Sequence, residues 1–138
     1  DELGDPIISK EHIFAFEWAS KKEIDKIEGN LHRMNDFMIG MFRGVGIKLI
    51  DFKVEFGRLK NSSRNEIILA DEISPDTCRL WDMKSEKKLD KDRFRQNLGN
   101  LFDAYQDVAR RLGILHENSN IRPLKFPKPK AVKIKRNK

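Results

Sequence analysis

The sequence predicts an α+β fold in which a mixed or antiparallel sheet hairpin packs against amphipathic helices. Apolar residues recur at helical spacing in two long segments, and between these segments they alternate with charged residues, as they do along a half-buried strand. The chain has 138 residues, of which 38% are hydrophobic. This length and composition are sufficient for one ordinary domain with a core.

The first long helix is predicted to begin after Ser20, because Ser20 and Glu23 form an S-x-x-E capping box. Residues 1–9 are typical of a loop, and a short apolar-aromatic segment at 13–18 follows them. Gly44 marks the end of the helix. The residues predicted to form its buried face are Ile24, Ile27, Leu31, Met34, Met38, Met41 and Phe42.

A period of two then predicts a strand over residues 47–57. Asp51, Lys53 and Glu55 share one face of this strand, with about 7 Å between alternate residues. The apolar residues on the opposite face are Ile50, Phe52, Val54 and Phe56. The row of charges has two interpretations, because it is also the pattern of a solvent-facing edge strand that avoids edge pairing.

A second strand is predicted at 66–70, after a polar turn, and the two strands most simply form an antiparallel hairpin. Asp71 follows the second strand directly, so the hairpin is expected to bring Asp71 close to Glu55. Neighbouring carboxylates repel unless a cation or a proton lies between them. Hard oxygen ligands suit Mg²⁺, which proteins usually hold with one or two carboxylates and substrate phosphates.

A loop is predicted at 71–82, and a second amphipathic helix is predicted from Asp90 to a stop at Gly113. The residues expected on its buried face are Phe94, Leu98, Leu101, Phe102, Tyr105, Val108 and Leu112.

Cations gather near the start of that predicted helix. Lys91, Arg93 and Arg95 lie there, with Asp76 and Arg79 in the preceding loop. Carboxylates for a metal beside cations for phosphate are what a phosphoryl-transfer site requires. The alternative is an exposed first helical turn, but cations there oppose the helix dipole by about 0.3–1 kcal/mol, so a bound anion would explain them.

The formal net charge of +6 equals the six basic residues between Phe126 and Lys138, a segment without acidic residues. The sequence therefore divides into a domain at 1–118 and a basic Pro/Lys-rich tail at 119–138. A rival interpretation is a non-catalytic module whose tail binds nucleic acid or an anionic surface, with an affinity that falls steeply with salt and does not depend on magnesium. We expect neither nucleic acid nor a membrane as a partner, because the excess charge is confined to a tail.

Several other classes of protein are disfavoured. The single Cys78 allows no intrachain disulfide, no apolar run approaches the roughly 20 residues of a membrane span, and the acidic first residues do not resemble a signal peptide, so a cytoplasmic location is expected. The three histidines are isolated from other zinc ligands. No Gly-rich phosphate loop is present, so part of any ATP pocket must come from elsewhere.

Three motifs resemble one enzyme family, the phosphoribosylaminoimidazole-succinocarboxamide synthases. The stretch LIDFKVEFG, at 49–57, resembles the family signature L-[aliphatic]-D-x-K-x-E-x-G, and LADEISPDTCRLWD, at 69–82, and LDKDRFRQ, at 89–96, are similar to two further blocks in the same order. The resemblance runs from Asp5 to Gly113 and covers the C-terminal half of the family's domain. The other half carries the glycine-rich nucleotide loop, so the chain alone is expected to be a fragment and inactive.

The resemblance implies a fold similar to ATP-grasp and kinase-like architectures. It also implies a reaction of de novo purine biosynthesis, in which ATP and Mg²⁺ drive the joining of carboxyaminoimidazole ribonucleotide to L-aspartate through an acyl phosphate. The implied partners are these small molecules, and a homo-oligomer is expected. A small-molecule kinase that shares only the metal hairpin is a second rival, and product analysis with and without L-aspartate separates the two.

By position, the resemblance implies that Glu55 and Asp71 bind magnesium and the nucleotide phosphates. Asp51 and Lys53 are implied to be catalytic: Asp51 faces the ribonucleotide carboxylate, through a second magnesium, and Lys53 neutralises charge on the transferred phosphoryl group. The residues implied to bind substrate are Asp76, at the ribose hydroxyls, Arg79, Lys91 and Arg95, at the 5′-phosphate, and Asp5.

Overall fold

The computed structural model describes residues 4, 6–60, 66–116 and 119, and its elements confirm the α+β class. The helices are α1 (Lys10–Ala15), α2 (Lys21–Gly44), α3 (Asp92–Arg95) and α4 (Leu101–Arg111). The strands are β1 (Ile47–Phe52), β2 (Phe56–Arg58), β3 (Ile67–Leu69) and β4 (Cys78–Asp82). Asp5 and the basic tail from residue 120 onward lie outside the described residues.

Helix α2 begins where its capping box predicts. The Glu23 backbone N–H donates to the Ser20 hydroxyl at 3.3 Å, and the Ser20 backbone N–H donates to the Glu23 carboxylate at 2.8 Å. Both contacts satisfy N–H groups that the first helical turn leaves without a partner. The predicted face is the buried one: Ile24, Met38 and Phe42 are its most buried residues.

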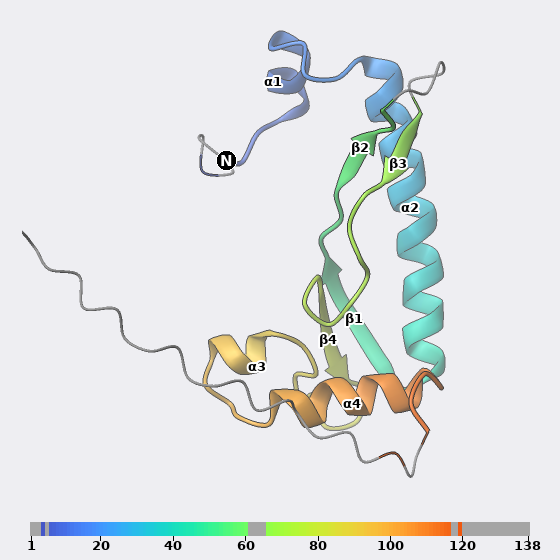
Figure 1. Cartoon of the computed structure of the whole chain (residues 1–138), viewed down its shortest axis with the longest axis vertical. Helices are drawn as coiled ribbons and strands as arrows, with labels where there is room; N and C mark the ends of the chain where they lie inside the picture. The colour runs from blue at the N-terminus through green and yellow to red at the C-terminus, as the bar shows by residue number, and fades with distance from the viewer. Residues whose placement is uncertain (1–3, 5, 61–65, 117–118, 120–138) are drawn as a thin grey trace, which may run out of the picture.

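The strands form two small antiparallel sheets, one of β1 with β4 and one of β2 with β3. Figure 1 shows the β1–β4 sheet beside the C-terminal half of α2 and the β2–β3 hairpin beside its N-terminal half. The predicted hairpin is thereby confirmed for β2 and β3. The prediction of one continuous strand over 47–57 was wrong, because Lys53–Glu55 lie between β1 and β2.

The break between β1 and β2 arises because the returning chain leaves the ladder and rejoins it. The Ala70 N–H donates to the Glu55 carbonyl at 2.9 Å, and the Lys53 N–H donates to the Thr77 carbonyl at 2.8 Å. Residues 71–76 loop out between these two hydrogen bonds. This loop places Asp71 beside Lys53, in the break between β1 and β2.

The predicted loop at 71–82 was wrong in its second half, where Cys78–Asp82 form β4. Cys78 and Leu80 are fully buried and alternate with the less buried Arg79 and Trp81. This alternation is the period of a strand with one face on the core. Over five residues of mixed composition it is too short to distinguish from a loop by sequence.

A bulge in β1 changes which of its side chains face the core. Leu49 pairs with Leu80 and Asp51 pairs with Arg79, so Ile50 is one extra residue relative to the partner strand. Ile50 is 39% exposed, and its predicted place on the apolar face was wrong. A one-residue shift reverses the facing of all later side chains, so Ile47 faces the core before the bulge and Phe52 packs against the core after it.

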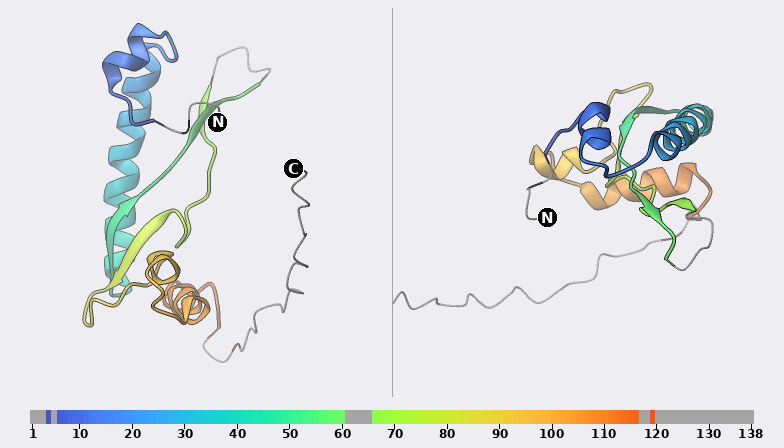
Figure 2. Two further views of the ribbon diagram at one scale, coloured as in Figure 1. Left: turned by 90° about the vertical axis from the view of Figure 1, so that its left-hand side faces the viewer. Right: turned by 90° about the horizontal axis from the view of Figure 1, so that it is seen from above.

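The core lies where α2, α4 and the β1–β4 sheet meet, and Figures 1 and 2 show α4 crossing one end of this arrangement. Ile47 and Leu80 are its largest fully buried apolar residues, and burial of each such side chain stabilises the fold by roughly 1.5–3 kcal/mol. The buried cluster comprises Met38, Phe42, Ile47, Cys78, Leu80, Leu89, Ala104 and Val108.

The prediction of one helix from Asp90 to Gly113 was wrong, because two helices, α3 and α4, form there. Helix α3 ends at Arg95, and Asn97, Gly99 and Asn100 have positive φ angles of 52°, 65° and 52° before α4 begins. A right-handed helix cannot pass through such residues. Phe94, on α3, and Leu98, between Asn97 and Gly99, were predicted to be buried but are 77% and 49% exposed. The predicted stop at Gly113 is confirmed, with φ +71°.

Helix α1 was not predicted, and none of its residues is buried. Each described helix is either too short or too polar to cross a bilayer.

Candidate active site

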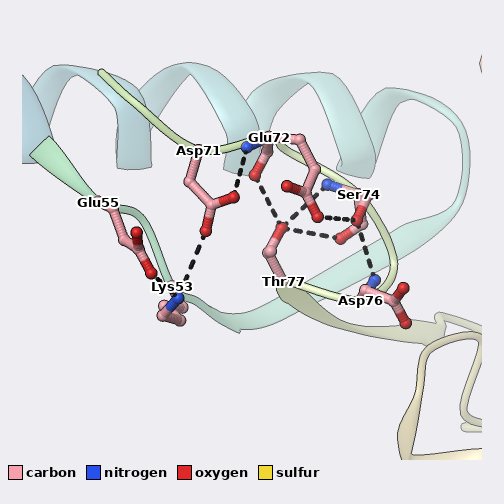
Figure 3. A network of polar contacts seen from close by, with 7 residues as sticks. All are labelled: Lys53, Glu55, Asp71, Glu72, Ser74, Asp76 and Thr77. Atoms are coloured by element: carbon pink, nitrogen blue, oxygen red, sulfur yellow. Dashed lines mark hydrogen bonds and ion pairs between the residues drawn. The ribbon is translucent and has the colours of Figure 1, made fainter. Parts of the chain in front are cut away.

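The first polar cluster joins three predicted residues at the break between β1 and β2. The Lys53 ammonium pairs with the Glu55 carboxylate, and it lies 3.4 Å from Oδ2 of Asp71 (Figure 3). Glu55 raises the pKa of Lys53 above its ordinary value, with a smaller contribution from Asp71. The hairpin thus directs Glu55 and Asp71 to one positive centre, as the sequence predicts.

The loop that presents Asp71 is fixed by its own side chains. The Glu72 N–H donates to the Asp71 carboxylate at 3.0 Å, and the Thr77 hydroxyl donates to the Glu72 carbonyl at 3.0 Å (Figure 3). The Ser74 N–H donates to the Thr77 hydroxyl at 3.0 Å. Hydrogen bonding with Glu72 is the main reason that the pKa of Asp71 lies below its ordinary value, so its carboxylate stays charged.

The donor set of this cluster fits a hard divalent cation. Two carboxyl side chains already share a cation, the Lys53 ammonium, and carboxylate oxygens are the ligands that Mg²⁺ takes. Among the described residues, no three His, Cys, Asp or Glu side chains converge on one point. Mg²⁺ is commonly held by only one or two carboxylates with phosphate oxygens and water, so two are sufficient.

A depression of about 230 Å³ adjoins this cluster and gathers most of the other predicted residues. Asp51 and Arg79 form an ion pair at 2.5 Å across the β1–β4 sheet, where their backbones are paired. Lys91, just before α3, and Arg95, the last residue of α3, also line the depression. The lining residues are Asp51, Phe52, Lys53, Thr77, Cys78, Arg79, Lys91 and Arg95. Four cations against one carboxylate give a wall suited to an anion.

Two aspartates behind this wall were missed by the sequence analysis. Asp92 lies 3.3 Å from Arg79 Nε and 3.9 Å from Arg95 Nη1, and Asp90 is fully buried beside it. Both lie in the motif at 89–96, where aspartates near a predicted helix start are ordinary capping candidates, so the sequence gave no signal of this contact. Arg93 points elsewhere, since its guanidinium donates to backbone carbonyls of Lys88, Leu98 and Gly99.

Asp76 lies away from both groups of residues and pairs with α4. The Tyr105 hydroxyl donates to its carboxylate at 2.5 Å, and the Asp76 N–H donates to the Ser74 hydroxyl at 3.1 Å. Cys78 lines the depression, but burial raises the pKa of its thiol, which disfavours a thiolate nucleophile. Asp5 lies outside the described residues.

Comparison with known proteins shows the family of this chain. The sequence model of SAICAR synthetase matches residues 1–112. The chain belongs to the SAICAR synthetase family. A phosphoribosylaminoimidazole-succinocarboxamide synthase of Pelagibacter ubique is 65% identical over 133 residues, which are 96% of this chain and 51% of that protein. The synthase of Rhodospirillum centenum is 60% identical over 85% of this chain and 46% of that protein.

Solved members of the SAICAR synthetase family share the fold. The Ehrlichia chaffeensis synthase matches with a TM-score of 0.79 and 49% identity, over 83% of this chain and 48% of that structure. A SAICAR synthetase in complex with ADP matches with a TM-score of 0.74 and 46% identity, over 81% of this chain and 46% of that structure. The chain spans about half the length of the curated relatives that it matches.

Proposed function

We propose that this chain supplies part of the active site of an ATP- and Mg²⁺-dependent ligase that joins carboxyaminoimidazole ribonucleotide to L-aspartate. One observation carries the proposal: Lys53 is held between Glu55 and Asp71 at the edge of a cation-lined depression. Membership of the SAICAR synthetase family supports the substrates, and the ADP complex of a relative supports the nucleotide.

Glu55 and Asp71 are the residues that would hold Mg²⁺ with the nucleotide phosphates, and Asp51 would take part in holding a second ion near the ribonucleotide carboxylate. When bound, Mg²⁺ neutralises charge on the phosphate oxygens. Lys53 is protonated at neutral pH like an ordinary lysine, and Glu55 raises its pKa further. Its ammonium is therefore available to neutralise charge on the transferred phosphoryl group.

Arg79, Lys91 and Arg95 would bind the 5′-phosphate of the ribonucleotide in the depression. Arginine forms paired hydrogen bonds with phosphate oxygens, and Lys91 adds a point charge. Asp76, held by Tyr105, would accept hydrogen bonds from ribose hydroxyls.

The reaction needs an activated carboxylate, because a free carboxylate is a poor acyl donor. An oxygen of the ribonucleotide carboxylate attacks the γ-phosphorus of ATP, and ADP leaves. The aspartate nitrogen then attacks the acyl carbon, the C–O bond breaks, inorganic phosphate leaves, and the nitrogen loses a proton. Lys53 would neutralise the negative charge on the transferred phosphoryl group, while the arginines would hold the ribonucleotide by its 5′-phosphate.

The test uses the protein expressed from its complete reading frame. Glu55→Gln and Asp71→Asn keep side-chain shape but remove the charge that a divalent cation requires, and each is expected to reduce turnover by at least a hundredfold. Glu66→Gln, an exposed acid just before β3, is the matched control. Near-normal turnover in either site variant would refute the metal assignment, and ADP release with a stable phosphorylated product that does not depend on L-aspartate would favour a kinase instead.

Small-molecule substrates are the partners that this proposal names. The homo-oligomer, the cytoplasmic location and the absence of a nucleic-acid or membrane partner stay predictions from the sequence.

A further inference from the structure

Asp90 is a carboxyl side chain that the fold buries completely. Its side chain is 0% exposed, although the chain places it just beside the cationic depression. Burial of a carboxylate is costly unless its oxygens receive hydrogen bonds, so its retention at this position calls for a specific partner set.

Both oxygens of Asp90 accept hydrogen bonds from backbone N–H groups. Oδ2 accepts from Leu80 at 2.8 Å, and Oδ1 accepts from Asp92 at 2.8 Å. The Leu80 carbonyl accepts from the Leu89 N–H at 2.8 Å. Both backbone groups of Leu80, its N–H and its carbonyl, therefore have hydrogen-bond partners on the outer edge of β4. Asp90 therefore ties the strand residue that follows Arg79 to the first residue of α3.

Asp92 extends this connection to the side chains of the depression. It is 8% exposed, and its two oxygens lie 3.3 Å from Arg79 Nε and 3.9 Å from Arg95 Nη1. Nε of Arg79 is turned toward Asp92, while Nη1 of Arg79 reaches Asp51. A planar guanidinium held at two of its nitrogens has few orientations left.

We infer that Asp92 is a positioning residue for Arg79 and Arg95, and that Asp90 fixes Asp92. The buried pair sets how far apart the two guanidinium groups stand and which of their N–H groups face a phosphate. This inference rests on the proposed binding of the 5′-phosphate by Arg79 and Arg95.

The experiment measures KM and kcat of the protein expressed from its complete reading frame for Asp92→Asn, Asp90→Asn and the matched control Asp36→Asn, an exposed position on α2. We expect Asp92→Asn to raise the KM for the ribonucleotide about tenfold, the size of a typical coupling energy between contacting residues. Its KM for ATP should change less than twofold. The inhibition constant of ribose 5-phosphate, tested as a competitive inhibitor, should rise in parallel with the ribonucleotide KM. Asp36→Asn should leave all three values unchanged.

A double-mutant cycle separates positioning from general destabilisation. In an Arg79→Gln, Arg95→Gln background, Asp92→Asn has no arginine left to orient, so its effect on the ribonucleotide KM should fall below twofold. A full effect in that background, or equal changes in both KM values and in the melting temperature, would overturn the inference. Asp90→Asn should reproduce the selective effect even if its melting temperature falls.

Failure of the proposed function has a different signature. If Arg79→Gln and Arg95→Gln leave the ribonucleotide KM unchanged, the phosphate assignment is wrong and this inference falls with it. If the arginine variants bind poorly while Asp92→Asn behaves as wild type, only the positioning role is overturned.

Discussion

The Lys53 ammonium lies 3.4 Å from Oδ2 of Asp71, although eighteen positions separate the two residues in the sequence. Lys53 also pairs with Glu55, so one lysine spans the two carboxylates that the hairpin brings together. A lysine in this position competes with any divalent cation for the same oxygens.

This competition gives the first prediction. In the protein expressed from its complete reading frame, Lys53→Met is expected to strengthen Mg²⁺ binding severalfold, because it leaves two carboxylates without a cation between them. The same change should reduce turnover roughly a hundredfold, because it removes charge neutralisation at the transferred phosphoryl group. Titration calorimetry with Mg²⁺ and a turnover assay measure the two effects. Lys48→Met, at an exposed position on β1, is the control, and an unchanged Mg²⁺ affinity in Lys53→Met would contradict the competition.

Two glycines near one end of the structure are predicted to respond in opposite directions to alanine. Gly46 has φ +73°, so Gly46→Ala should lower the free energy of unfolding by about 1 kcal/mol through backbone strain alone. An added Cβ there would lie 3.7 Å from Arg111, which is an ordinary contact. Gly40 lies within α2 with open space around it, so Gly40→Ala should raise the free energy of unfolding by about 0.5–1 kcal/mol. Urea denaturation measures both, and changes of the same sign would refute this account.

Glu23 is predicted to make stability depend on acid pH. Arg58 on β2 donates to its carboxylate at 2.7 Å, and this contact, with the Ser20 capping hydrogen bonds, lowers the pKa of Glu23 to about 2 from its ordinary 4.5. Because the folded-state value lies below the unfolded one, the contribution of Glu23 is fully present above pH 4.5 and is lost as the pH falls toward 2.

We therefore expect Glu23→Gln to be less stable than wild type at pH 7, with the difference shrinking as the pH falls below 4.5. Urea denaturation at several pH values measures it, with Glu66→Gln as the control. A difference that does not depend on pH would mean that Glu23 acts through packing and not through its charge.

Tyr105 is predicted to resist ionisation. Its burial, followed by its hydrogen bond to Asp76, raises the pKa of the phenol above its ordinary value of 10. Tyr105 is the one tyrosine of this chain. In the protein expressed from its complete reading frame, subtracting the absorbance titration of Tyr105→Phe removes the signal of tyrosines outside this chain. No tyrosinate signal is expected from Tyr105 near pH 10, and Asp76→Asn should move its pKa partway down. An ordinary titration in wild type would show that the Asp76 contact does not persist.

Local signals predicted well what local interactions determine. The Ser20–Glu23 box fixes the start of α2, and the alternation around Asp51 predicts β1, although Lys53 and Glu55 lie beyond the end of that strand. The predicted hairpin also placed Glu55 and Asp71 close together, and both contact Lys53 in the structure. At the second helix the apolar spacing misled, although Gly99 and Asn100 contained the signal of a break.

What the sequence could not predict depends on partners that are distant along the chain. The bulge at Ile50 is set by the register of β1 with β4, and neither the strand nor its register is visible from a five-residue segment. The role of Asp90 depends on Leu80 reaching it across the fold. Aspartates near a helix start are ordinary capping candidates, so Asp90 and Asp92 gave no reason to expect contact with two arginines.

The interruption at Lys53–Glu55 divides the proposed ligands between two separate pieces of sheet. Glu55 and Asp71 travel with the hairpin, which Arg58 anchors to α2, whereas Asp51 and Arg79 belong to the paired β1 and β4. Substitutions that tilt the hairpin as a unit would shift one reactant against the other without disturbing either set of contacts. Selection could thus adjust the alignment of the two reactants through residues that touch neither.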